Sequence, residues 1–119
     1  LAKNDRFVPE HKSIQRFATA SLEERNALIA KDPAYGEMIC SCEQVTKAEI
    51  RAALHNPLGV STMTGIKYRT RAMMGTCQSG FCQMKIERLI EEELGLAPNE
   101  VVYSRPNSWV LTGKMREED

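Results

Sequence analysis

Cys40-Ser41-Cys42 stands 34 residues before Cys77-Gln78-Ser79-Gly80-Phe81-Cys82, and these two stretches hold all four cysteines of the chain. Thiolates are soft ligands that favour iron–sulfur clusters and zinc. Residues i and i+2 lie at most about 7 Å apart, so the C-x-C pair can serve one centre without a large fold around it. The spacing therefore predicts a single tetrathiolate site, with Cys40, Cys42, Cys77 and Cys82 as its metal ligands and no thiol left over.

The surroundings of the cysteines suit a negatively charged centre. Gly75 and Gly80 flank Cys77, and glycine lets a backbone turn with positive φ and come close to a ligand. Cys82 is expected in the first turn of a helix, where free N–H groups and the positive helix end favour an anion. Nearby basic residues can offset the charge, although each equally fits an ordinary solvated surface: Lys67, Arg69, Arg71 and Lys85.

Other uses of the four thiols are weighed against an iron–sulfur cluster. Zinc sites usually place two to four residues between the members of each pair, and C-x-C departs from that pattern. A disulfide within Cys40-Ser41-Cys42 would be strained, whereas a Cys77–Cys82 disulfide is feasible. Nothing marks the chain as secreted, and cytosolic thiols are usually reduced. A [2Fe-2S] cluster is the favoured interpretation, with zinc, or no metal in an isolated preparation, as the alternative.

Length and charge narrow the class of protein. The 119 residues fit one domain or one domain with a tail. Sixteen basic and sixteen acidic residues cancel, which gives no support to nucleic-acid binding. No apolar run approaches 18 residues, so no membrane span is expected. The chain begins at Leu1 and its first twenty residues are polar and irregular, so we expect a piece of a longer protein.

Helix signals recur along the chain. Capping boxes at Ser21–Glu24 and Thr46–Glu49 predict helices over 22–31 and 47–55. In the first, Leu22, Leu28 and Ile29 are expected to lie on one side; in the second, Ile50 and Leu54 are expected to be buried. A third helix, begun by Ser61 or Thr62, should run to about residue 71 with Ile66 inward.

The region from residue 81 to the end of the chain changes character at Pro98. Before it, a fourth helix over 81–94 has the clearest pattern, because apolar residues recur at helical spacing and Gly95 can end it: Ile86, Leu89, Ile90 and Leu94. After it, the β-prone runs 101–103 and 109–111 predict a hairpin. The expected fold is mainly α, a small helical domain with its cysteine loops at helix ends plus a short C-terminal β-hairpin.

Two segments resemble a known family. CSCEQVTKAEI (40–50) and GIKYRTRAMMGTCQSGFC (65–82) resemble the bacterioferritin-associated ferredoxin-like [2Fe-2S] domain, and the resemblance extends over about 40–94. It implies a small helical fold in which the four matching cysteines ligate one [2Fe-2S] cluster. Ser79 departs from the pattern, because glycine is expected there in many relatives.

The flanking segments extend the resemblance. ALIAKDPAYGEMICSCE (27–43) and SRPNSWVLTGKMRE (104–117) are similar to the C-terminal region of anaerobic-type FAD-dependent glycerol-3-phosphate dehydrogenases. That similarity implies an upstream FAD-binding domain in the same protein that oxidises sn-glycerol 3-phosphate to dihydroxyacetone phosphate. This chain would then be a non-catalytic relay from the flavin to an unidentified electron acceptor. It would lie in the cytoplasm, either free or membrane-associated through partners.

The resemblance also divides the chain. Residues 1–35 are expected to form a linker and helix from the upstream flavin domain, residues 36–97 the cluster-binding domain, and residues 98–119 an extension with the hairpin. The segment to about Ala20 is expected to be loosely ordered. Two alternatives stay open: the cluster domain of another flavin-dependent oxidoreductase, or a zinc-stapled interaction module with no redox role.

Overall fold

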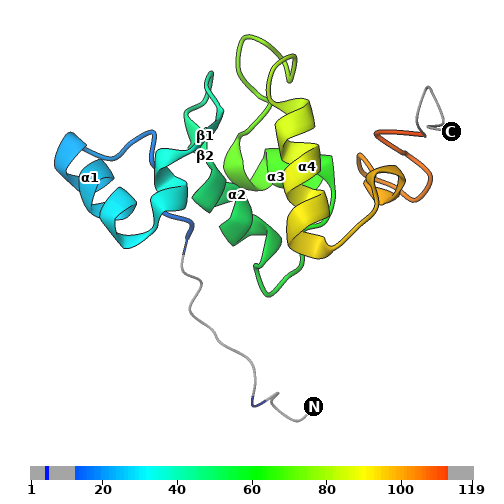
Figure 1. Cartoon of the computed structure of the whole chain (residues 1–119), viewed down its shortest axis with the longest axis horizontal. Helices are drawn as coiled ribbons and strands as arrows, with labels where there is room; N and C mark the ends of the chain where they lie inside the picture. Colours follow the sequence, from blue (N-terminus) through cyan, green and yellow to red (C-terminus); the bar gives the residue numbers. More distant parts are fainter. Residues whose placement is uncertain (1–4, 6–12, 113–119) are drawn as a thin grey trace, which may run out of the picture.

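The computed structural model describes residue 5 and residues 13–112 of the chain. This part is largely helical and contains one antiparallel sheet of two short strands. Three helices pack together and the first helix lies to one side of them (Figure 1). In order, the elements are α1 (Leu22–Lys31), η1 (Pro33–Gly36), β1 (Met38–Cys40), β2 (Val45–Thr46), α2 (Lys47–Leu54), α3 (Met63–Thr70), α4 (Gln83–Leu94) and η2 (Pro98–Glu100).

The core lies between α2, α3 and α4. Most side chains of the helical pattern are buried: Ile50 and Leu54 from α2, Ile66 from α3, and Ile86, Leu89 and Ile90 from α4. Leu94 is only partly buried against this core. Full burial of one such side chain stabilises the fold by about 1.5–3 kcal/mol. Gly95 ends α4 with φ 65°, as expected. This core fixes the helix ends from which the cysteine loops emerge.

Helix α1 begins as predicted. The Ser21 N–H donates to Glu24 Oε2 at 2.9 Å, and the Glu24 N–H donates to Ser21 Oγ at 3.3 Å. Helix α1 has no buried residue, and Leu22 is 74% exposed. Polar contacts connect the helix to the segment before it, since Arg25 Nε donates to the carbonyls of Phe17 and Ala20 at 3.1 Å each.

The segment before α1 is better ordered than its sequence suggests. Phe17 is only 8% exposed, its N–H donates to Glu49 Oε1 at 3.1 Å, and the Arg25 guanidinium lies 4.9 Å from the centre of its ring. The expectation of loose order is therefore wrong around Phe17, because its ring and its N–H both find partners within the fold. Residues 1–4 and 6–12 lie outside the described part.

The start of α2 depends on Glu49. Its Oε2 accepts the Thr46 N–H at 2.6 Å and the Thr46 hydroxyl at 2.9 Å. Glu49 is 4% exposed, and a buried carboxylate is costly unless its oxygens are hydrogen-bonded. Both oxygens are bonded here, so this glutamate joins the start of α2 to the segment around Phe17.

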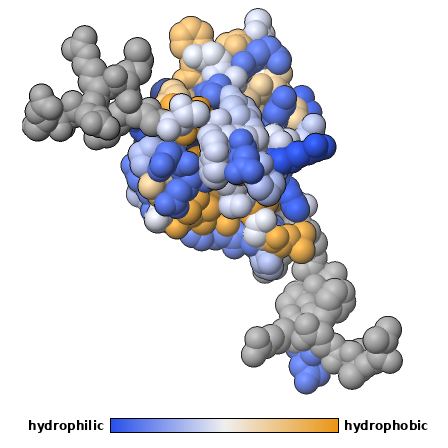
Figure 2. All heavy atoms as spheres, turned by 90° about the vertical axis from the view of Figure 1, so that its right-hand side faces the viewer, coloured by the Kyte–Doolittle hydropathy of each residue, from blue (hydrophilic) through white to orange (hydrophobic). Residues whose placement is uncertain are grey.

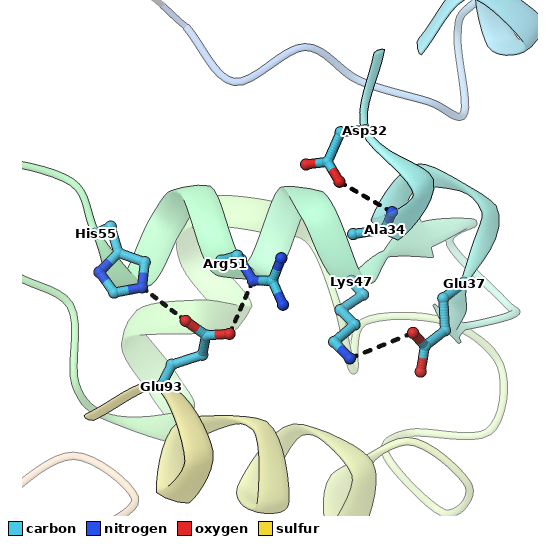
Figure 3. Close-up of polar contacts among 7 residues, drawn as sticks. All are labelled: Asp32, Ala34, Glu37, Lys47, Arg51, His55 and Glu93. Carbon is cyan, nitrogen blue, oxygen red and sulfur yellow. Dashed lines mark hydrogen bonds and ion pairs between the residues drawn. The ribbon is translucent and has the colours of Figure 1, made fainter. Parts of the chain in front are cut away.

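A second carboxylate joins α2 to α4. Glu93 Oε1 accepts from Arg51 Nε and its Oε2 contacts His55 Nε2, each at 2.8 Å (Figure 3). His55, and then Arg51, hold the pKa of Glu93 below its usual value. Nearer the cysteines, Lys47 Nζ pairs with Glu37 Oε2 at 3.3 Å (Figure 3). These pairs connect the two cysteine-bearing regions along α2.

The two-stranded sheet lies before α2. Strands β1 and β2 pair antiparallel, with Met38 opposite Thr46 and Cys40 opposite Val45; no sequence pattern predicted this sheet. At the predicted hairpin, the described residues form one isolated bridge between Val102 and Trp109. A hydrogen bond from the Tyr103 N–H to the Ser108 carbonyl, at 2.8 Å, lies beside that bridge.

The C-terminal segment also caps α3. The N–H of Met63 donates to the Val102 carbonyl at 3.2 Å, and the N–H of Thr64 donates to the Tyr103 carbonyl at 2.8 Å. Val101 is fully buried. The first N–H groups of a helix lack partners inside the helix, so this segment supplies the acceptors for the start of α3.

The surface is mixed in character. On the face shown in Figure 2, apolar residues gather in small groups among polar ones. The large apolar side chains exposed on the whole surface include Leu22, Leu58, Tyr68 and Phe81. None of the helices within residues 13–112 combines the length and apolar character needed to cross a bilayer.

Candidate metal centre

The fold brings both cysteine stretches to one end of the molecule. Cys40 ends β1, and Cys42 lies in the turn that joins β1 to β2; we call residues 40–44 the first loop. Cys77 lies between α3 and α4, and Cys82 is the residue directly before α4; we call residues 71–82 the second loop. In Figure 1 both loops project from the upper end of the helical core.

The four thiols associate across the loops, in two pairs. The Cys42 thiol lies beside Cys77 and is the main cause that holds the pKa of Cys77 below its ordinary value. Burial, and then the neighbouring Cys40 thiol, raise the pKa of Cys82 to about 11. Cys40 and Cys82 are buried, whereas Cys42 is exposed. The structure thus contains an inner pair, Cys40 and Cys82, and an outer pair, Cys42 and Cys77.

Backbone N–H groups face the sulfur atoms. The N–H groups of Phe81, Ser79 and Gly80 are directed at Cys77 and act to lower its pKa. The N–H of Met73 is directed at Cys82 and lowers the pKa of that thiol against the larger effect of burial. N–H groups that donate to sulfur stabilise the thiolate form and tune the potential of a cluster bound there.

The curvature of the second loop has a different source from the one expected. Gly75 and Gly80 do not have positive φ; Met73, Gln78 and Ser79 do, at 70°, 46° and 72°. The glycines matter for space instead. A Cβ on Gly80 would lie 3.1 Å from the Cys77 carbonyl oxygen, and one on Gly75 would overlap Cys42. The expected positive φ is wrong for Gly80, whereas the close approach that glycine permits is what the contacts at both positions show.

Charge near the site is already partly paired. Arg71, the residue after α3, has φ 68° and its Nε lies 3.3 Å from Glu43 Oε2. This ion pair joins the second loop to the residue that follows Cys42. Sequence reasoning considered Arg71 only as a counter-charge to the centre and missed its acidic partner on the first loop.

The C-terminal segment reaches the second loop. Tyr103, which is 39% exposed, lines a cavity of about 120 Å³ together with Lys67, Gln78 and Ser79. Residues of α3, the second loop and the C-terminal segment thus line one cavity. Trp109 is 43% exposed. Neither aromatic residue belongs to the buried core.

The donor set can be tested against the groups that it could hold. Among the described residues, no three or more His, Cys, Asp or Glu side chains converge closely enough to hold one metal ion. A structural zinc site requires all four ligands around a single ion. A [2Fe-2S] core spreads four thiolates over two irons, and the two cross-loop thiol pairs at one end of the fold supply four thiols for such a core.

Comparison with known proteins also indicates a [2Fe-2S] binding domain. Residues 38–92 match the family model of the BFD-like [2Fe-2S] binding domain. Over 118 residues, 99% of this chain, the sequence is 36% identical to the glycerol 3-phosphate dehydrogenase of Caloramator mitchellensis. Over 65 residues, 55% of this chain, it is 32% identical to one subunit of the anaerobic glycerol-3-phosphate dehydrogenase of Escherichia coli K12.

A third relative is named for a different activity. The hydrogen cyanide synthase subunit HcnB of Pseudomonas aeruginosa is 46% identical over 55 residues, 43% of this chain. The chain spans 25% of the Caloramator protein, 12% of the Escherichia coli protein and 11% of the Pseudomonas protein. No solved structure matches the chain. Residues 38–92 therefore match the BFD-like [2Fe-2S] binding domain family, in a chain whose sequence is similar to part of glycerol-3-phosphate dehydrogenases.

Proposed function

We propose that Cys40, Cys42, Cys77 and Cys82 ligate one [2Fe-2S] cluster. The observation that carries the proposal is the meeting of the two loops, which places one cysteine of each stretch beside one of the other. Four thiolates are the usual ligand set of such a cluster. The match of residues 38–92 to the [2Fe-2S] domain family supports the same assignment.

The residues around the thiols have defined parts in this proposal. An oxidised cluster with four thiolate ligands carries a charge of −2, and the N–H groups that face Cys77 and Cys82 stabilise negative charge at the sulfur atoms. Burial of Cys40 and Cys82 keeps water from the inner side, while exposed Cys42 leaves the outer side open. Exposure and hydrogen bonding to sulfur are the levers that set the cluster potential.

We further propose that the whole protein is an FAD-dependent glycerol-3-phosphate dehydrogenase. In it the cluster would pass electrons, one at a time, from a flavin in an upstream domain to an acceptor. The relatives named for this activity are about four to eight times longer than the matched segment, so room for such a domain is present in them. This proposal includes a linker and helix over residues 1–35, the cluster-binding domain over 36–97 and an extension over 98–119. It also includes a cytoplasmic location and FAD as the cofactor of the upstream domain.

Anaerobic reconstitution tests the cluster. The 119-residue chain, supplied with iron and sulfide, is expected to hold two irons and two sulfides. It should show a visible chromophore that dithionite bleaches and an electron paramagnetic resonance signal on reduction. Replacement of Cys40 by Ser should abolish the chromophore, whereas replacement of exposed Ser41 by Ala should not. One tightly bound zinc that iron and sulfide cannot displace would overturn the proposal in favour of the zinc-stapled module.

The match to the hydrogen cyanide synthase subunit favours a second candidate. In this candidate the same cluster domain serves another flavin-dependent oxidoreductase. The identity of 46% over 55 residues to a subunit named for a different activity is the observation that favours it. The two candidates separate when the full-length protein is mixed with sn-glycerol 3-phosphate under anaerobic conditions. Bleaching of the flavin supports the dehydrogenase. No bleaching, in a preparation with flavin and cluster both bound, supports the second candidate.

A further inference from the structure

Gly75 is the point at which the second loop passes directly against the first. A Cβ added to Gly75 would overlap the Cβ of Cys42 and lie 3.3 Å from both its Cα and its Sγ. The φ of Gly75 is not in the left-handed region, so an alanine could adopt this backbone conformation. The lack of space, and not the conformation, excludes a side chain here.

Neither loop can easily yield to such a side chain. The Gly75 carbonyl accepts the Gln78 N–H at 3.0 Å and Gln78 Nε2 at 2.9 Å. On the opposite side the contacted atoms are Cα and Cβ of Cys42, which move only with the backbone. The Arg71–Glu43 pair holds the same two loops together next to this contact. A side chain at position 75 must therefore move one loop away from the other.

We propose that Gly75 is a positioning residue for the cluster. Because it has no side chain, the two loops approach closely enough for the Cys42 and Cys77 thiols to serve the same centre. The inference rests on the proposed cluster and deepens it, since it names the residue that sets the separation of the first and second loops. Gly75 does not touch the reacting atoms and acts only through Cys42.

Two alanine variants test this role in the reconstituted full chain. Gly36 is the matched control: its φ is not in the left-handed region, and a Cβ there would meet only Ile29, at an ordinary 3.7 Å. Gly36→Ala should bind two irons and two sulfides like the unaltered chain. Gly75→Ala should hold less than one-tenth of that amount or lose it to a chelator at least tenfold faster. Equal occupancy and equal loss rates in both variants would overturn the proposal.

A measurement without iron separates this inference from the proposed function. Cys42→Gly removes the Cβ that Gly75→Ala would overlap, so the two changes should compensate in the metal-free chain. Gly75→Ala alone should lower the denaturation midpoint clearly, or prevent folding, and should do so far less in the Cys42→Gly background. Additive effects of the two substitutions would show that the loops do not press on each other there. This result stands even if the unaltered chain binds no cluster.

Discussion

At the residue scale, the second loop stores conformational strain next to the thiols. Gln78 and Ser79 have φ values of 46° and 72°, a region that costs an L-residue other than glycine about 1–2 kcal/mol. The consequence is a chain that curls around Cys77 and directs the N–H groups of residues 79–81 at its sulfur. Strain of this kind gathers at functional sites, where the surrounding structure holds it in place.

Ser79→Gly should relieve part of that strain. We expect the free energy of unfolding of the metal-free chain to rise by about 0.5–1 kcal/mol, because glycine adopts positive φ without steric cost. The serine hydroxyl contributes only a long 3.4 Å contact to Gln83. Denaturant titration measures the change. Ser41→Gly in the first loop is the control, since Ser41 does not have positive φ, and it should destabilise. Equal destabilisation by both substitutions would contradict the assignment of strain.

Glu87 is a second unusual residue. It is 1% exposed on α4, and within the described part of the chain its Oε1 has no hydrogen-bond partner. Burial, and then the neighbouring Glu91, raise its pKa to about 7, while Arg88 acts in the opposite direction. The folded chain therefore holds a proton on Glu87 at pH values at which the unfolded chain has already lost it.

This pKa predicts how stability changes with pH. The contribution of Glu87 is fully present below its unfolded pKa of about 4.5 and is lost as the pH rises through about 7. Glu87→Gln cannot ionise, so it should gain stability relative to the unaltered chain between pH 4.5 and pH 8, by roughly 1–3 kcal/mol. Unfolding curves at several pH values give the difference. Glu92→Gln, at an exposed site on the same helix, should show no such trend, and a pH-independent difference for Glu87→Gln would refute the argument.

The sequence predicts some of these residues and not others. The proposed ligation by four cysteines is predicted from their number and spacing, because four thiolates are the usual ligand set of one [2Fe-2S] cluster. The steric role of Gly75 depends on Cys42, more than thirty residues earlier, and no local pattern contains that contact. The partner of Arg71 is hidden for the same reason, since Glu43 meets it only when the loops converge.

At the scale of the elements, helix starts are predictable where one short motif contains both partners. The capping boxes at Ser21 and Thr46 begin α1 and α2 at the expected residues, and Gly95 ends α4. The side that a helix buries depends on what lies beside it, which is why α1 shows no buried apolar side. Strands of three and two residues are too short to show alternation, so no pattern predicts β1 and β2.

The loops and helices should differ in stability when no metal is bound. Helix α4 contributes three apolar side chains to the core, whereas residues 75–80 are held mainly by short-range bonds such as Gly80 N–H to Cys77 carbonyl at 3.0 Å. Amide exchange in residues 40–42 and 75–80 should be at least tenfold faster than in α4, since local opening is easiest where few apolar contacts are buried. Cluster binding should slow the loops and leave α4 unchanged. Loops as protected as α4 in the metal-free chain would contradict this expectation.

At the scale of the whole molecule, the site lies at one end and the anchoring contacts lie elsewhere. Glu93 joins α2 to α4 (Figure 3), and the C-terminal segment caps α3. Loss of an outer ligand, Cys42 or Cys77, should therefore leave the helical core folded. This separation makes it practical to remove the proposed cluster without destroying the rest of the protein.

Cys77→Ser in the full-length protein tests the relay. Reduction of the flavin by sn-glycerol 3-phosphate should stay largely intact, because the proposed substrate site lies upstream of this chain. Re-oxidation by the physiological acceptor should slow at least tenfold, because the exit route for electrons is damaged. Stopped-flow measurement separates the two half-reactions, with Thr76→Ala at the exposed neighbouring site as control. A variant that lacks the cluster but passes electrons to the acceptor at the normal rate would mean that the cluster is structural or regulatory.

The crossed arrangement of the thiol pairs also has a mechanical consequence. Cys40 and Cys82 stand 42 residues apart in the chain yet lie side by side as the inner pair. A cluster held by both would shield everything between them from tension applied at the two termini. In a single-molecule pulling experiment, α1 and the C-terminal segment would extend first. A further length of about 150 Å would be released only when iron–sulfur bonds rupture. The force needed to unfold the domain would then be set by the strength of the bonds between iron and the thiolates.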